Sequence, residues 1–297
     1  MKIKKYGAID IGSNAVRLLV ANVIEEKNKE PQFKKSSLVR VPIRLGSDAF
    51  VTGKISDENI KRMIDAMEAF KLIMKVHGVE KYKACATSAM REAENGAEVI
   101  ATILKNTEID IDIIDGKKEA AIISSTDLNQ LIESDSTYLY VDVGGGSTEF
   151  TLFSKGRIIN SKSFKIGTVR LINNKKSENK AIFKEVQEWI EDNTKIYKRI
   201  SLIGSGGNIN KLFKMSGRTE GKPISFIYLN AQYQFLKQMT YQERISELSL
   251  NPDRADVIIP ATKIYLSAMK WSGSRKIYVP KIGLSDGIIK SLFYNKL

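Results

Sequence analysis

The organisation of the chain follows from Tyr138-Leu139-Tyr140-Val141-Asp142-Val143-Gly144-Gly145-Gly146-Ser147-Thr148-Glu149-Phe150. Its apolar start predicts a buried strand over 138–143, and a second strand resumes at Phe150. The glycines between them lack Cβ atoms, so several backbone N–H groups can turn toward one point and bind phosphate oxygens. Asp142, at the strand end, suits a hard divalent cation beside those phosphates. A glycine-rich hairpin without a ligand is the alternative interpretation.

A second segment near the N-terminus follows the same plan and reads Ile9-Asp10-Ile11-Gly12-Ser13-Asn14-Ala15-Val16-Arg17-Leu18-Leu19-Val20. Both segments run apolar-Asp-apolar-Gly, then a small polar turn, then an apolar strand. Two such copies suggest a duplicated unit, in which each half presents a carboxylate and a phosphate loop. Chance similarity of two short hairpins is the alternative. Two facing loops are expected to clamp a phosphoanhydride and its metal.

Composition excludes several classes of protein. The 297 residues suffice for two domains, and the single cysteine excludes an internal disulfide, which fits the reducing cytoplasm. No apolar run reaches the length of a membrane span, and Lys4-Lys5 leads directly into a strand, so neither a membrane segment nor a secretory signal is expected. The single histidine rules out a His-rich zinc site. Any catalytic metal should therefore be a hard ion held by oxygen atoms.

The formal net charge of +13 indicates either a polyanionic partner or a well-solvated surface. The chain has no RNP motif, zinc finger or arginine-rich arm, so nucleic acid is not the expected partner. Because the lysines are spread through the chain, charge alone does not identify the polyanion.

The first half of the chain predicts strands at 5–11, 15–24 and 33–41, followed by the turn-rich segment 40–46. Arg40 and Arg44 in that segment fit a phosphate contact or a plain surface position equally well. Ser56 caps a predicted helix that runs to His77. A strand at 83–87 then leads into Ser88–Glu92, where small polar residues and Arg91 suggest a ligand-binding sheet edge.

Glu119 falls in the first turns of a helix expected at about 117–132, just after a strand at 109–114. A favourable interaction with the helix dipole is the simple explanation for a glutamate there.

The second half contains another glycine-rich segment. A strand at 200–203 runs into Gly204-Ser205-Gly206-Gly207-Asn208, which opens a helix and predicts an anion site built from helix N-terminal N–H groups. It matches neither the Walker pattern nor the dinucleotide fingerprint. Before it, the polar stretch 173–180 predicts a mobile loop and 181–196 a helix. After it, 255–271 predicts a helix with Pro260 in its first turns, 276–279 a strand and 284–294 a closing helix.

Taken together and in order, seven motifs resemble the exopolyphosphatase / guanosine pentaphosphate phosphohydrolase (Ppx/GppA) family, within the actin–hexokinase–Hsp70 superfamily. The resemblance spans nearly the whole chain and implies an α/β fold of two ribonuclease-H-like lobes with mixed sheets flanking an interdomain cleft. The lobes are expected at 1–120 and 121–283, with the closing helix 284–297 packing back on the first lobe. The motifs are Ala8–Asn14, Arg44–Gly46, Ala86–Arg91, Gly116–Ala120, Asp142–Glu149, Gly167–Arg170 and Gly204–Asn208.

The resemblance also implies the roles of the site residues. Glu119 is the general base for the attacking water, Arg91 contacts the transferred phosphoryl group, and Asp142 and Glu149 hold Mg²⁺, with Mn²⁺ as the other candidate metal. This assignment agrees with phosphoryl-transfer chemistry, which needs charge neutralisation and an in-line nucleophile more than covalent catalysis. The implied phosphate-binding residues are Asp10, Gly12, Ser13, Asn14, Gly144, Gly145, Gly146, Ser147, Thr148, Gly204, Ser205, Gly206 and Gly207.

The expected activity is hydrolysis of terminal phosphate from polyphosphate, favouring short to medium chains because the length matches family members without further helical domains. Guanosine pentaphosphate (pppGpp) is the alternative substrate. A nucleotide-dependent phosphotransferase and a non-catalytic phosphate sensor are further alternatives, although the Gly-x-x-Glu-Ala setting of Glu119 favours hydrolysis. Ser285 and Pro260 depart from the family pattern. The sequence therefore does not predict whether the chain keeps the basic contact at position 285 or the nucleotide contacts near position 260. Homodimers are common among relatives, so a cytoplasmic homodimer is expected.

Overall fold

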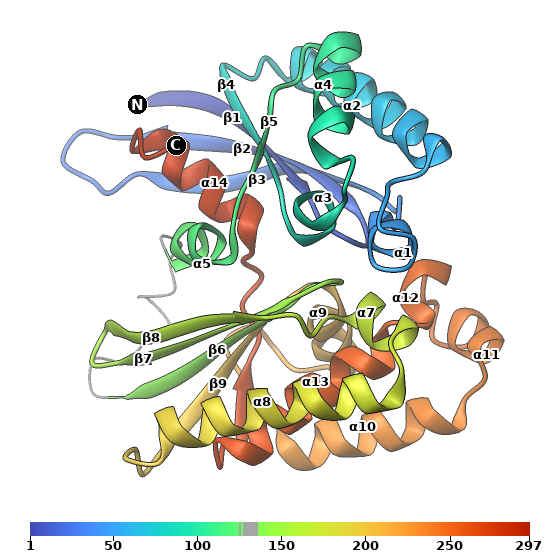
Figure 1. Cartoon of the computed structure of the whole chain (residues 1–297). Helices are drawn as coiled ribbons and strands as arrows, with labels where there is room; N and C mark the ends of the chain where they lie inside the picture. The colour runs from blue at the N-terminus through green and yellow to red at the C-terminus, as the bar shows by residue number, and fades with distance from the viewer. Residues whose placement is uncertain (125, 127–135) are drawn as a thin grey trace. The chain divides into compact units, whose positions relative to one another are not determined.

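The computed structural model of the chain describes residues 1–124, 126 and 136–297. The chain divides into two compact α/β units, which are Met1–Thr126 with Ile282–Leu297, and Asp127–Lys281. The last helix of the chain therefore belongs to the first unit (Figure 1). No helix among the described residues is both long and apolar enough to cross a membrane.

The first unit is built on a five-stranded sheet with the strand order β3-β2-β1-β4-β5. Strands β1, β2 and β3 form an antiparallel meander, and β4 and β5 run parallel to β1. The strands are β1 (Lys2–Ile11), β2 (Val16–Glu25), β3 (Gln32–Val41), β4 (Lys81–Ala86) and β5 (Ile111–Ile113).

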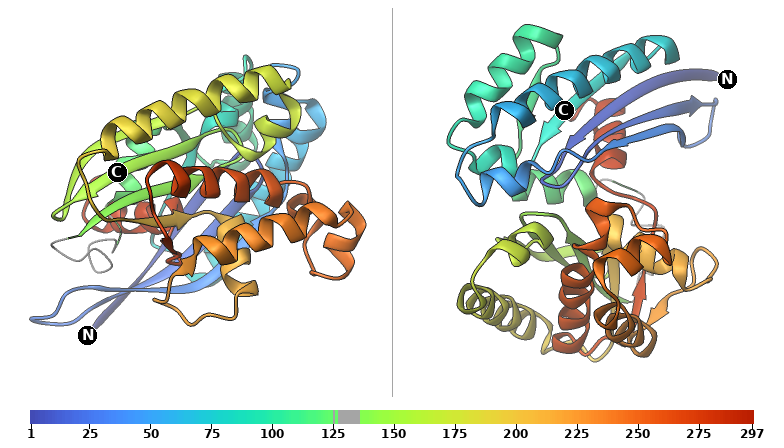
Figure 2. Two further views of the ribbon diagram at one scale, coloured as in Figure 1. Left: turned by 90° about the horizontal axis from the view of Figure 1, so that it is seen from below. Right: turned by 90° about the vertical axis from the view of Figure 1, so that its right-hand side faces the viewer.

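Helices cover both faces of this sheet (Figure 2). Ile9 belongs to the same buried cluster as Phe70 of α2, whereas the ring of Tyr6 lies 6.5 Å from that of Phe293 of α14 on the other face. Because successive strand residues alternate, Asp10 lies on the face that α14 covers. The helices are α1 (Leu45–Ala49), α2 (Asp57–His77), α3 (Ser88–Glu92), α4 (Gly96–Thr107), α5 (Gly116–Ser124) and α14 (Leu284–Phe293).

The second unit repeats this topology. Its six-stranded sheet has the order β10-β11-β9-β6-β7-β8. Strands β6, β7 and β8 form the meander, β9 and β11 follow in parallel, and β10 adds an antiparallel edge. The paired hairpins suggested a duplicated unit, and both units have the ribonuclease-H-like arrangement that the family resemblance implied. The strands are β6 (Thr137–Val143), β7 (Thr148–Ser154), β8 (Arg157–Phe164), β9 (Ile200–Ser205), β10 (Ile224–Ser225) and β11 (Lys276–Tyr278).

The core of the second unit lies between its sheet and its helices. Aromatic rings pack within it, since the ring of the partly buried Trp189 of α8 lies 5.9 Å from that of Phe164 and 6.3 Å from that of Phe150. The helices are α7 (Thr168–Asn173), α8 (Lys176–Thr194), α9 (Gly207–Met215), α10 (Phe226–Gln238), α11 (Tyr241–Ser246), α12 (Pro252–Ala255) and α13 (Ile258–Trp271).

The predicted mobile loop at 173–180 is wrong, because α8 already begins at Lys176. Glu178 supports this early start by accepting a hydrogen bond from the Lys175 backbone N–H at 3.3 Å. Asn179 adds a second tie, donating from Nδ2 to the Leu171 carbonyl at 2.9 Å. The polar composition that suggested a loop instead forms the solvent-facing first turns of an amphipathic helix.

One other helix prediction needs correction. The helix expected at 255–271 is divided into α12 and α13, and Pro260 lies in the first turn of α13, where its missing N–H costs no hydrogen bond. Ser88–Glu92 follow the carboxyl end of β4, as predicted, and form the short helix α3. The helix expected at 117–132 is present as α5 to Ser124, and its proposed continuation at 125 and 127–132 lies outside the described residues.

Candidate functional site

The β1–β2 hairpin carries the first predicted phosphate loop. The Gly12 N–H donates to the Ala15 carbonyl at 3.2 Å and closes the turn. The buried Ser13 and Ser88 hydroxyl oxygens lie 2.9 Å apart, so the loop is tied to the start of α3. The structure thus places small polar groups from two elements of the first unit together.

The turn-rich segment after β3 lies against the same loop. The Arg44 N–H donates to the Asn14 carbonyl at 3.1 Å, and the Gly46 N–H donates to the Ser13 carbonyl at 2.7 Å. Arg44 adopts a left-handed backbone conformation with φ 62°, which is uncommon for a residue with a long side chain. This conformation fixes an arginine beside the loop.

The β6–β7 hairpin closes in the same way, with the Gly144 N–H donating to the Ser147 carbonyl at 3.0 Å. The N-terminus of α7 binds the loop carbonyls, because Val169 N–H donates to Gly145 O at 2.9 Å. Gly167 allows this approach, since a Cβ there would lie 2.3 Å from Gly145 O. Within the described part of the chain, no protein group accepts from the Gly145 and Gly146 amides.

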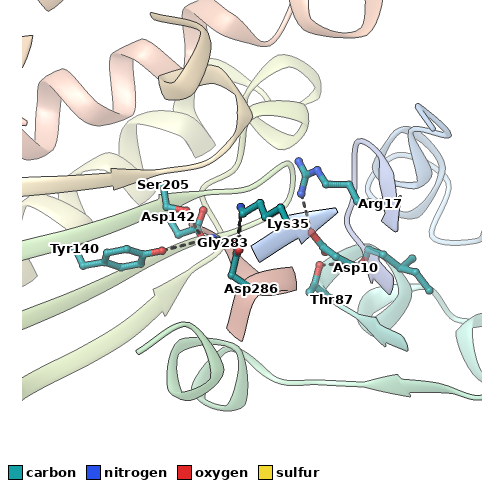
Figure 3. A network of polar contacts seen from close by, with 10 residues as sticks. Asp10, Arg17, Lys35, Thr87, Tyr140, Asp142, Ser205, Gly283 and Asp286 are labelled. Carbon is teal, nitrogen blue, oxygen red and sulfur yellow. Dashed lines mark hydrogen bonds and ion pairs between the residues drawn. The ribbon is translucent and has the colours of Figure 1, made fainter. Parts of the chain in front are cut away.

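Asp142 and Glu149 are direct cross-strand partners on β6 and β7. The same row continues to Ser163 on β8 and to Ser205 on β9. Glu149 is buried, and its Oε1 accepts from the Ser147 and Ser163 hydroxyls, each at 2.8 Å. The Ser205 hydroxyl donates to Asp142 Oδ2 at 3.3 Å (Figure 3). Two carboxylates therefore lie side by side next to the glycine loop.

Asp10 occupies the equivalent position in the first unit, but its partner differs. Its cross-strand neighbour is Arg17, whose Nη1 lies 2.7 Å from Asp10 Oδ2 (Figure 3). The Asp10 side chain is only 7% exposed, so the guanidinium compensates a nearly buried carboxylate. Sequence reasoning missed Arg17, although it stands seven positions after Asp10, as Glu149 does after Asp142.

The second glycine segment lies against the end of β6. Gly206 has φ 120°, and a Cβ there would meet the Val143 carbonyl at 2.9 Å and Asp142 Oδ1 at 3.6 Å. Arg254 of α12 donates from Nη1 to the Gly207 carbonyl at 3.0 Å. The structure therefore places Ser205 and Gly206 of this segment beside Asp142.

Two buried tyrosines border this carboxylate. The Tyr140 hydroxyl donates to Asp142 Oδ2 at 3.4 Å, and the Tyr265 hydroxyl donates to the Ser205 carbonyl. Burial, and secondarily the charge of Asp142, raises the pKa of both phenols well above the ordinary value. Both therefore remain neutral hydrogen-bond donors near neutral pH.

Glu119 lies in the first turn of α5, which begins directly after β5. Asp115 caps this helix, since its Oδ1 accepts from the Lys118 N–H at 2.7 Å. Glu119 is buried with Ile122 and Ile123, while Lys117 and Lys118 are exposed. The glutamate thus projects from the inner face of the helix, on the side of the protein interior.

Arg91 of α3 contacts the same junction. Its Nη1 donates to the Ile114 carbonyl at 2.6 Å, immediately before the Asp115 cap. This contact ties α3 to the start of α5. A contact between Arg91 and a transferred phosphoryl group stays a prediction.

The donor set beside the glycine loop fits a hard cation. Among the described residues, no group of three or more His, Cys, Asp or Glu side chains is arranged to hold a metal ion. Asp142 and Glu149 nevertheless provide adjacent carboxylates, and Mg²⁺ commonly uses only one or two protein carboxylates together with water and substrate phosphates.

The predicted residues fall into two sets. The first unit contains Asp10, Gly12, Ser13, Asn14, Arg91 and Glu119, and the second contains Asp142, Gly144–Glu149 and Gly204–Gly207. Sequence reasoning did not identify Ser163 or the tyrosines, because only the strand register and tertiary packing place them beside the carboxylates.

Two ribonuclease-H-like units, each with a carboxylate–glycine hairpin, define the class of this α/β protein. The Ppx/GppA phosphatase family matches residues 23–296. The chain belongs to this family.

Individual relatives agree. A bifunctional 3-dehydroquinate synthase/phosphatase of Fusobacterium nucleatum is 32% identical over 92% of this chain, which spans only 44% of that protein's length. Exopolyphosphatase 2 of Mycobacterium tuberculosis is 25% identical, covering 98% of this chain and 99% of the relative. Among solved structures, an exopolyphosphatase from Cytophaga hutchinsonii is 26% identical with a TM-score of 0.86, covering 98% of each chain. A family member from Aquifex aeolicus shares the fold, with 22% identity, a TM-score of 0.78 and 99% coverage of each chain.

Proposed function

We propose that the protein is an exopolyphosphatase that hydrolyses terminal orthophosphate from inorganic polyphosphate with the help of a divalent metal ion. The observation that carries the proposal is the row of Asp142 and Glu149 beside the Gly144–Gly146 loop. The names of the M. tuberculosis and C. hutchinsonii relatives support the choice of substrate.

The second unit would bind the metal and phosphate. Asp142 and Glu149 would hold Mg²⁺, which supplies charge neutralisation on the phosphate oxygens when bound. N–H groups of α7 donate hydrogen bonds to the loop carbonyls. The Gly145 and Gly146 N–H groups therefore point away from α7 and suit an anion. Ser147 is oriented by its hydrogen bond to Glu149.

The first unit would contribute proton transfer and further phosphate contacts. Glu119 would accept the proton of the attacking water, and its burial beside Ile122 and Ile123 limits its motion. The Gly12–Asn14 loop and the adjacent Arg44 would bind phosphate oxygens. Because Asp10 is paired with Arg17, this loop carries less uncompensated negative charge than the loop of the second unit.

Guanosine pentaphosphate is the second candidate substrate. The family includes both activities in its name, which supports the nucleotide as an alternative substrate. Polyphosphate comes first because a net charge of +13 favours a ligand that is anionic along its whole length.

The deciding experiment measures phosphate release from short-chain polyphosphate, long-chain polyphosphate and guanosine pentaphosphate, each at low and at physiological salt with Mg²⁺ present. We expect the highest kcat/KM on short to medium polyphosphate, with a steep fall as salt rises, since binding releases counterions. A preference for the nucleotide with little salt dependence on polyphosphate would replace the first candidate by the second. Binding of all three without phosphate release would favour the sensor alternative.

The same proposal includes a homodimer in the cytoplasm. The chain has a single cysteine, Cys85, which is buried and suits a reducing compartment. Light scattering coupled to gel filtration tests the dimer directly, and a monomer at micromolar concentration would contradict it.

A further inference from the structure

Helix α14 packs inside the first unit although it is the last helix of the chain (Figure 1). It contacts β1, β2 and β4 of the sheet as well as helix α5. Its residues Leu284, Gly287, Ile288 and Leu292 are buried. The helix therefore lies between the sheet and the element that carries Glu119.

The contact between α14 and α5 is made at a glycine. A Cβ built on Gly287 would lie 2.3 Å from the backbone oxygen of Ile122, 2.7 Å from its Cγ2 and 2.8 Å from its carbonyl carbon. Real Cβ atoms do not approach backbone atoms so closely, so any side chain at position 287 would displace one helix. Ile122 is one turn from Glu119 on the same buried face of α5.

Helix α14 is itself fixed to the sheet. Asp286 Oδ2 accepts from the Gly283 N–H at 3.0 Å, which caps the helix, and from Lys35 Nζ of β3 at 2.9 Å (Figure 3). The Phe293 ring packs edge-on against Phe33 of the same strand at 5.6 Å. Both ends of α14 are therefore attached to β3, and a bulkier residue at position 287 is expected to shift α5 rather than α14.

We propose that Gly287 is a positioning residue: its backbone contact with Ile122 sets the placement of α5 and thereby of the Glu119 carboxylate. This inference rests on the proposed role of Glu119 as general base. Gly287 touches no substrate and acts only through α5. A displacement of about 1 Å in a catalytic group is sufficient to cost roughly 100-fold in rate.

The test is Gly287→Ala, with Gly283→Ala as the matched control. Gly283 has φ −163°, an ordinary extended conformation, and no described atom lies within 4 Å of a Cβ built there. We expect Gly287→Ala to lower kcat about 10–100-fold with KM for polyphosphate changed less than about 3-fold. Gly283→Ala should stay within about 2-fold of the parent protein in both constants. Circular dichroism and thermal melting establish that each variant is folded.

A double-mutant cycle with Glu119→Gln separates positioning from general damage. If Gly287 acts through Glu119, then Gly287→Ala should lower kcat by less than about 2-fold in the Glu119→Gln background. The inference would be overturned if Gly287→Ala lowered kcat by the same factor in the parent protein and in Glu119→Gln. It would also be overturned if folded Gly287→Ala kept the kcat of the parent protein. Should Gly287→Ala not fold, Ile122→Ala removes the Cγ2 atom at this contact while it keeps the backbone oxygen, and this variant is subject to the same cycle.

The cycle also distinguishes this inference from the proposed function. Near-normal kcat in Glu119→Gln alone removes the general base, and with it the basis for positioning. A different outcome excludes only the positioning role of Gly287. In it, Glu119→Gln alone lowers kcat strongly, and Gly287→Ala lowers kcat by the same factor whether or not Glu119 is present.

Discussion

Arg17 and Glu149 stand at equivalent positions of the two hairpins, yet their charges are opposite. In the first unit, the cross-strand pair of Asp10 and Arg17 is close to neutral, whereas the pair of Asp142 and Glu149 contains two carboxylates. Cations are attracted to the second pair and not to the first. The two hairpins therefore share a plan but differ in charge, and the carboxylate pair of the second is the one that suits a metal.

Glu119→Gln is expected to lower turnover by about two to four decades while polyphosphate binding is largely kept, because the amide cannot accept the proton of the attacking water. Single-turnover phosphate release and equilibrium binding measure the two properties separately. Near-normal turnover in the folded variant would exclude Glu119 from the mechanism.

Arg44→Gly should separate stability from binding. Glycine relieves the left-handed strain at φ 62°, which we expect to offset part of the lost side-chain contacts, so that the melting temperature falls little or rises. The KM for polyphosphate should rise several-fold as a cation is removed from the Gly12–Asn14 loop. Lys155→Gly is the matched control, because Lys155 is an exposed basic residue with φ 49° in the β7–β8 turn.

Lys155→Gly should stabilise the protein by up to about 1 kcal/mol without changing KM, because relief of the left-handed conformation is partly offset by the backbone entropy that glycine loses on folding. An equal rise in KM in both variants would assign the effect of Arg44 to net charge alone.

At the scale of elements, the two hairpins were predictable from sequence because their register depends on local residues. The apolar run from Tyr138 to Val143, the three glycines and the resumed strand indicate a hairpin, and the structure gives the register in which Asp142 meets Glu149. The start of α8 was not predictable in this way. Its first turn is polar throughout, and its helical state depends on the tie between Asn179 and the Leu171 carbonyl as well as on the Glu178 cap.

The contacts of single side chains were predictable only in part. Asp142 was predicted from its place at a strand end beside three glycines, whereas Glu149 and Glu119 were predicted through the family resemblance. The contacts of Arg91 with Ile114 and of Gly287 with Ile122 join segments far apart in the chain, and no local pattern encodes them.

The capping carboxylate of α14 should make stability depend on pH. Burial raises the pKa of Asp286 above its ordinary value of 3.8, against the opposing effects of Lys35 and the Gly283 N–H. The folded protein therefore holds this proton more tightly than the unfolded chain, which contributes stability at pH below 3.8 that is lost as the pH rises through the raised pKa.

Asp286→Asn retains an acceptor for the cap but does not titrate. The free energy of unfolding of the parent protein should therefore decline relative to that of Asp286→Asn as the pH rises across this window. Urea unfolding at a series of pH values measures the difference. Lys35 lowers the pKa of Asp286, so Lys35→Met should move the decline in the free energy of unfolding to higher pH. A difference that is constant with pH, or grows in favour of the parent protein, would contradict the assignment.

At the scale of the whole molecule, the ribonuclease-H-like topology is present twice, and the sequence signalled it through two short segments with a common plan. Chain order alone did not reveal α10 and α11, which have no counterpart in the first unit. These helices belong to the part of the second unit that the duplication does not explain, and no repeated motif pointed to them.

Metal removal is the prediction that concerns the whole molecule. Chelation should abolish phosphate release, and Mg²⁺ or Mn²⁺ should restore it, because the two carboxylates need a cation to bind an anionic substrate. Mg²⁺ should also raise the melting temperature of the parent protein in the presence of phosphate, and this shift should vanish in Asp142→Asn. Full activity in chelator-treated, metal-free protein would contradict the proposed metal dependence.

The position of α14 has a consequence for synthesis on the ribosome. Residues Asp127–Lys281 form one continuous unit, whereas the first unit gains α14 only after residue 293 has been translated. Until then, the nascent sheet lacks the helix whose Phe293 packs near Tyr6 and Phe33, and this apolar face is exposed to chaperones. The unit translated first is therefore the one completed last.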